Sequence, residues 1–105
     1  MQYNNLFYCV NIDTILFFSK YEFSSMKDEF LAEYKIIGVN IRRFRDKLNY
    51  SQDDLASRCS VNRAKISKIE NAREDYMFST LLEVCKALGK TLQEIIQKYE
   101  GFDYE

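Results

Sequence analysis

The sequence contains no histidine and no proline, and only three of its 105 residues are glycine. Without histidine the chain lacks the usual general base, the Ser-His and Cys-His nucleophile pairs and most zinc sites. We therefore expect no enzyme, no catalytic residue, no metal centre and no cofactor. The shortage of proline and glycine removes the residues that most often interrupt helices, which favours helices joined by short connections.

Cysteine is also scarce, at Cys9, Cys59 and Cys85. An odd number of cysteines without paired spacing argues against a disulfide framework and against a metal knuckle. We expect reduced residues in a cytoplasmic protein, with Cys59 and Cys85 acting as small side chains of a core.

The length of 105 residues fits one domain, and the 47% apolar and 30% charged residues are typical of a folded globular chain. The net charge of −1 conceals an uneven distribution. Residues 36–72 hold eight Lys or Arg against four Asp or Glu, whereas both flanks are acidic. A basic middle segment of this kind predicts a local surface for nucleic acid.

Residues 1–25 form an apolar and aromatic extension of unknown role, densest from Leu6 to Phe18. That stretch contains Asn11 and Asp13 and is shorter than the about 20 residues that cross a bilayer, so we expect no membrane span. Three interpretations stay open: an extension packed on the domain, a dimerisation arm, or sequence upstream of a true start at Met26. The expected domain covers residues 26–99, and residues 100–105 form a tail.

Apolar residues recur every three or four positions from Phe30 to Leu48, which predicts a first helix. Ser25, with Asp28 three residues later, is one start signal for this helix. Because Gly38 weakens a helix by about 1 kcal/mol relative to alanine, a start nearer Ile36 is the other possibility. Asn49 and the residue after it end the helix.

Four further helices are indicated by their caps. A short second helix follows Ser51, a third follows the N-cap Asn62, the fourth ends at Gly89, and Thr91 opens the fifth in a capping box. The sequence thus predicts an all-α fold of five helices. The residues expected to face the core of the second to fifth helices are Leu55, Ala56, Cys59, Ile66, Ile69, Phe78, Leu81, Leu82, Cys85, Leu88, Leu92, Ile95, Ile96 and Tyr99.

Two short helices joined by a tight turn have helix-turn-helix spacing. The motifs around them are Ile37-Gly38, Ile41-Arg42, Phe44-Arg45, Ser51 to Ala56, Val61 to Asn71, Thr80 to Leu82, Lys86 to Gly89 and Leu92 to Ile96. In this order and spacing, residues 36–99 resemble the lambda-repressor-like (Cro-type, XRE-like) DNA-binding domain. The resemblance implies a five-helix fold whose third helix enters the major groove.

The resemblance assigns DNA contacts to the second and third helices and to the residues just after them. The residues concerned are Gln52, Asn62, Arg63, Ala64, Lys65, Ser67, Lys68, Asn71 and Arg73. Arg63 and Lys68 would contact base edges, and Ala64 a thymine methyl group. Lys65, Asn71 and Arg73 would contact phosphates, and Ser67 would allow close approach. Gln52 would bind a phosphate and brace the third helix.

The resemblance also implies a partly buried structural ion pair between Arg45 and Glu70. Two positions depart from the family pattern, since Ser60 and Ala72 stand where glycine is usual and where the backbone tends to be left-handed. The loop after the third helix is acidic at Glu74 and Asp75, where relatives often have basic phosphate contacts.

The expected function is that of a sequence-specific DNA-binding transcriptional regulator of the repressor or controller type. It would bind double-stranded DNA as a homodimer on a pseudo-palindromic operator, with recognition helices about 34 Å apart. Tyr99, Phe102 and Tyr104 are candidates for the dimer surface. The alternative is a protein-interaction module of the antitoxin type, which the acidic loop favours. No small-molecule ligand is indicated.

Overall fold

The computed structural model describes residues 28–104, which form five α-helices after one short 3-10 helix and contain no strand. The elements are η1 (Asp28–Phe30), α2 (Leu31–Lys47), α3 (Gln52–Ser57), α4 (Arg63–Glu70), α5 (Phe78–Leu88) and α6 (Leu92–Ile96). The prediction of an all-α fold with five helices is confirmed. The interpretations of residues 1–25 concern a segment outside the described residues.

Helices α3, α4 and α6 start at the caps expected from the sequence. The Ser51 side chain accepts a hydrogen bond from the Asp54 amide at 2.9 Å, and the Asp54 carboxylate accepts one from the Ser51 amide. Thr91 and Glu94 form the same reciprocal capping box at α6. These local bonds satisfy amide groups that the first turn of a helix leaves free.

The start of α2 differs from the expectation. The helix begins at Leu31 and not near Ile36, so that Gly38 lies in its interior. A Cβ atom at Gly38 would lie 2.5 Å from the carbonyl oxygen of Glu70 and 2.7 Å from that of Ile69. Glycine is required here because the end of α4 passes against the backbone of α2, and this packing outweighs its low helix propensity.

The helix ends depend on left-handed residues. Asn49 and Ala72 have φ values of 59° and 52°, and Gly89 has a φ of 68°. Ala72 is therefore left-handed, as the family pattern suggests. Ser60 is not among the residues with positive φ, contrary to expectation. The connection from Arg58 to Asn62 is long enough to reverse the chain without a left-handed residue at that position.

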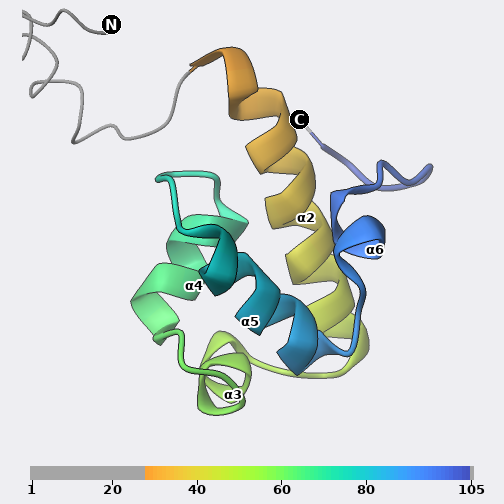
Figure 1. The fold of residues 1–105 in the computed structure, drawn as a ribbon. Coiled ribbons are helices and arrows are strands. Elements are labelled where there is room, and N and C mark those ends of the chain that lie inside the picture. The colour runs from red at the N-terminus through yellow and green to blue at the C-terminus, as the bar shows by residue number, and fades with distance from the viewer. Residues whose placement is uncertain (1–27, 105) are drawn as a thin grey trace, which may run out of the picture.

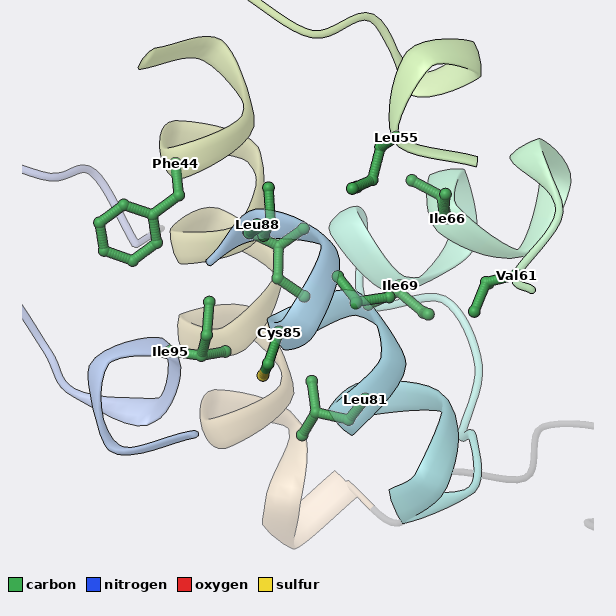
Figure 2. Close-up of a cluster of buried hydrophobic side chains, with 11 residues drawn as sticks. Phe44, Leu55, Val61, Ile66, Ile69, Leu81, Cys85, Leu88 and Ile95 are labelled. Atoms are coloured by element: carbon green, nitrogen blue, oxygen red, sulfur yellow. The ribbon is translucent and has the colours of Figure 1, made fainter. Parts of the chain in front are cut away.

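The core fills the space between α2, α4 and α5, and it is closed by α3 and α6. In Figure 1, α4 lies to one side of α2, and α6 with the C-terminal tail lies to the other. Figure 2 shows side chains from all five helices converging on this space, with Leu88, Ile69 and Cys85 near its middle. The fully buried side chains are Ile41, Leu55, Ile66, Ile69, Ile95, Val84 and Asn40.

Several residues expected in the core lie at the surface. Phe78, Leu82 and Ile96 are 60%, 42% and 49% exposed, whereas Val84 is buried. The buried stripe of α5 runs through Leu81, Val84, Cys85 and Leu88. Leu82 lies one residue off this stripe, and Phe78 lies in the first turn of α5, where it lines a surface groove.

The C-terminal segment also differs from the expectation, because α6 ends at Ile96 and Gln97 is extended. Tyr99 therefore lies beyond the helix, where its ring packs edge-on against Phe44 with ring centres 5.9 Å apart. The buried Asn40 side chain donates to the carbonyl oxygens of Ile95 and Gln97, both at 2.6 Å. The hydroxyl of Tyr104 donates to Asn40 Oδ1 at 2.7 Å, so the tail is fastened to α2.

Candidate nucleic-acid interface

Helix α4 is anchored by one apolar side and presents the other to solvent. Ile66 and Ile69 are buried three residues apart and fix the rotation of the helix about its axis. Arg63, Ala64 and Lys68 are consequently exposed, and Ser67 is half-buried between them. At the start of α4, the side chain of Asn62 accepts a hydrogen bond from the Lys65 amide at 2.8 Å, so this residue acts as the helix cap.

Arg45 and Glu70 form the buried ion pair expected from the sequence. Arg45 Nε donates to Glu70 Oε2 at 2.6 Å, and Nη2 donates to Oε1 at 2.9 Å. The hydrogen bonds to the Glu70 carboxylate raise the pKa of Arg45 above its usual range, so the guanidinium stays charged. Arg45 Nη1 also donates to the carbonyl oxygen of Tyr50 at 2.8 Å, which links the pair to the segment before α3.

Gln52 joins this ion pair at the first residue of α3. Its Nε2 atom donates to Glu70 Oε1 at 3.1 Å. The amide thus connects the beginning of α3 to the end of α4, and with Arg45 it sets the relative position of the two short helices. The Gln52 side chain is half-buried.

Each of the three basic side chains of α4 has a carboxylate neighbour from another element. Arg63 Nε lies 3.5 Å from Asp53 Oδ1, with both side chains mostly exposed. Lys65 Nζ lies 2.7 Å from Glu74 Oε1, and Lys68 Nζ lies 3.4 Å from Glu74 Oε2. Lys68 and Arg63 still project from the surface, since their side chains are 52% and 65% exposed.

Lys65 lies in a different position from the other two cations. Its side chain is 29% exposed and its ammonium group also donates to the carbonyl oxygen of Asp75 at 3.1 Å. The ammonium is therefore turned toward the loop between α4 and α5. The hydrogen bond from Lys65 holds the pKa of Glu74 below its usual range, so the carboxylate opposite it is ionised.

The last two predicted contacts lie where α4 ends. Asn71 is exposed, and its Nδ2 atom donates to the Ser67 carbonyl oxygen at 2.8 Å. Arg73 is exposed, and its backbone amide donates to the Lys68 carbonyl oxygen at 2.9 Å. This bond and the left-handed Ala72 close the helix and place both side chains beside its C-terminal turn.

Sequence reasoning missed the partners of the cations. Glu74 lies nine residues after Lys65, beyond the end of the helix, so helical periodicity does not bring the two together. Asp53 lies in the first turn of α3, so its approach to Arg63 depends on the packing of the two short helices. Among residues 28–104 no three metal-ligating side chains form a cluster, and no helix there is long and apolar enough to span a membrane.

The sequence is similar to a known domain family and to known proteins. A family model described as a helix-turn-helix domain matches residues 38–101. A hypothetical transcription factor of Neisseria meningitidis serogroup B is 28% identical over 61 residues, 58% of this chain and 58% of that protein. The control protein C.SmaI of Serratia marcescens is 28% identical over 69 residues, 66% of this chain and 82% of that protein. The chain thus spans less than two thirds of the Neisseria protein. No solved structure matches it significantly.

Proposed function

The chain belongs to the helix-turn-helix domain family, and from this premise we propose that it is a sequence-specific transcriptional regulator that reads operator DNA through α4. The family match confirms the resemblance found in the sequence. Two relatives that are named as a transcription factor and as a control protein support a regulator of the repressor or controller type. Such a regulator would act in the cytoplasm on double-stranded DNA.

The observation that carries this proposal is the outward face of α4. Arg63, Ala64 and Lys68 are exposed on one helix whose opposite side is locked into the core. Arginine can donate two hydrogen bonds to a guanine edge, and the major groove is wide enough to admit a helix. We assign base contacts to Arg63 and Lys68 and methyl contact to Ala64.

Phosphate contacts would position α4 on the duplex. We assign them to Gln52, Asn71 and Arg73, which lie at the start of α3 and at the end of α4. Asn62 would contribute by holding the first turn of α4, and the small Ser67 side chain would let the helix approach the groove. Contacts of this kind fix register without reading sequence.

A homodimer would give the protein two recognition helices on one site. Tyr99, Phe102 and Tyr104 are the residues proposed for its surface, and their half-buried rings stack on one another and against α2 of their own chain. The exposed apolar side chains Phe30, Phe78 and Ile96 line a separate groove.

Selection of bound duplexes from a random pool tests the proposal directly. We expect a site of two inverted half-sites whose centres are about one helical turn, or roughly 34 Å, apart. Changing Arg63 and Lys68 to alanine is expected to abolish the sequence preference. Recovery of the same site by the double variant would show that α4 does not read the bases.

A protein-interaction module of the antitoxin type is the second candidate. It is favoured by the carboxylate neighbours of all three α4 cations, which reduce the positive potential of the face. Binding to random-sequence DNA at low salt separates the two functions, because affinity carried by phosphate contacts falls steeply as salt rises. Absence of such binding would favour the interaction module.

A further inference from the structure

The carboxylate of Glu74 bridges two lysines of α4. One oxygen lies 2.7 Å from Lys65 Nζ and the other lies 3.4 Å from Lys68 Nζ. A phosphate oxygen accepts hydrogen bonds from the same ammonium protons that a carboxylate oxygen uses. Glu74 therefore occupies the anion position that these two side chains together would offer.

The loop that carries Glu74 is braced on α2. The Tyr34 hydroxyl donates to Asp75 Oδ1, which also accepts from the Tyr76 amide at 2.8 Å. The rings of Tyr34 and Tyr76 pack edge-to-face with centres 5.4 Å apart. Because Asp75 is held in this way, the backbone of its neighbour Glu74 is positioned beside the lysines of α4.

Arg63 provides an internal comparison. Its neighbour Asp53 is 75% exposed and the separation of 3.5 Å is longer than that of Lys65 from Glu74. Ion pairs between exposed side chains contribute little and break easily. Of the three α4 cations, Arg63 is thus the most available to an external anion and Lys65 the least.

We infer that Glu74 sets the DNA affinity of this protein by competing with the DNA for two lysines, Lys65 for a phosphate contact and Lys68 for a base contact. The inference rests on the proposed DNA-binding function and specifies which cations of α4 contribute to it. In the natural sequence the duplex either displaces Glu74 from the lysines or binds without them. In either case the affinity for DNA is lower than it would be if all three α4 cations were free to contact the duplex.

Glu74→Gln tests this, because glutamine keeps the size of the side chain and removes its charge. Binding of the full chain to a fluorescent random-sequence duplex is measured by anisotropy between 50 and 200 mM salt. We expect about tenfold tighter binding at low salt and a slope of log affinity against log salt that is steeper by about one, since the phosphate contact of Lys65 contributes about 0.9. Glu100→Gln, in the exposed tail, is the control with the same change of net charge.

Lys65→Ala in both backgrounds makes the test specific to the proposed pair. We expect the substitution to weaken binding at least fivefold more in the Glu74→Gln protein than in the natural sequence. Thermal unfolding of each variant confirms that it is folded. Equal effects of Lys65→Ala in the two backgrounds, or equal binding by Glu74→Gln and Glu100→Gln, would overturn the inference. Failure of every folded variant to bind DNA at low salt would overturn the proposed function and this inference with it.

Discussion

Gly38, in the middle of α2, lies directly against the carbonyl oxygen of Glu70 at the end of α4. The contact joins the longest helix of the described residues to the helix that presents the candidate DNA face. The two backbones lie so close here that a single carbon added at Gly38 would come within 2.5 Å of that oxygen. The position of α4 therefore depends on the absence of a side chain in α2.

Gly38→Ala is expected to destabilise the protein although alanine is the better helix former. The added methyl group would clash with backbone atoms, which cannot rotate away as a side chain could. We expect a loss of about 2–3 kcal/mol in the free energy of unfolding, measured by urea denaturation. Gly89→Ala is the matched control, because open space surrounds that position and only its left-handed φ of 68° opposes a side chain. Gly89→Ala should lower the free energy of unfolding by about 1 kcal/mol. If it lowers this free energy as much as Gly38→Ala does, or more, the explanation is wrong.

Glu70→Gln is expected to lower stability by about 3 kcal/mol, because it leaves the buried Arg45 guanidinium without its counter-charge. For a domain of this size the thermal midpoint should fall by more than about 10 °C. Asp53→Asn breaks the exposed pair with Arg63 and should change the stability by less than about 0.5 kcal/mol. Similar midpoints for the two variants would show that the Arg45–Glu70 pair does not anchor α4.

The rings of Tyr34 and Tyr76 are in contact, but only the Tyr34 hydroxyl has a hydrogen-bond partner. Replacing each residue by phenylalanine should therefore change the free energy of unfolding differently. The Tyr34 hydroxyl donates to Asp75, and its removal should lower the free energy of unfolding by about 1 kcal/mol. The Tyr76 hydroxyl is buried without a hydrogen-bond partner, so Tyr76→Phe should be neutral or stabilising. Urea denaturation at pH 7 compares them, and a larger loss for Tyr76→Phe would rule out this assignment.

The alkaline range gives a further test of the Tyr34 contact. The hydrogen bond to Asp75, together with burial, raises the pKa of Tyr34 from 10.0 to about 12. The folded state therefore holds this proton more tightly than the unfolded chain does. The stabilisation is complete below about pH 10 and is lost as the pH rises through about 12. The stability difference between the natural protein and Tyr34→Phe should accordingly be constant up to pH 9 and shrink above pH 10. A stability difference that persists unchanged beyond pH 12 would show that the Tyr34–Asp75 hydrogen bond does not stabilise the fold.

The features that could be predicted from the sequence are those set by neighbouring residues. Ser51 with Asp54, Asn62 and Thr91 with Glu94 cap helices through bonds that span three residues, and each helix start follows from them. Local sequence patterns are therefore sufficient to predict the five helices and the helix-turn-helix spacing.

The features that escaped prediction depend on residues distant in the chain. The start of α2 was misplaced because the advantage of a glycine at position 38 comes from Glu70, 32 residues later. No local pattern distinguishes Asn40 in the sequence, yet its side chain donates hydrogen bonds to the carbonyl oxygens of Ile95 and Gln97. Phe78 and Leu82 fit an apolar pattern as well as Val84 does, and only the arrangement of the other helices decides which of them is buried.

The attachment of Gln52 and Arg45 to the same Glu70 carboxylate has a kinetic consequence. It couples the start of α3, the end of α4 and the interior of α2 through one group, so the two short helices are already in their mutual orientation before any duplex arrives. Association with DNA should then proceed as rigid docking in a single phase whose rate rises linearly with DNA concentration, without a slow isomerisation step. Severing the Gln52 bond would introduce such a step while leaving the outward side chains of α4 in place.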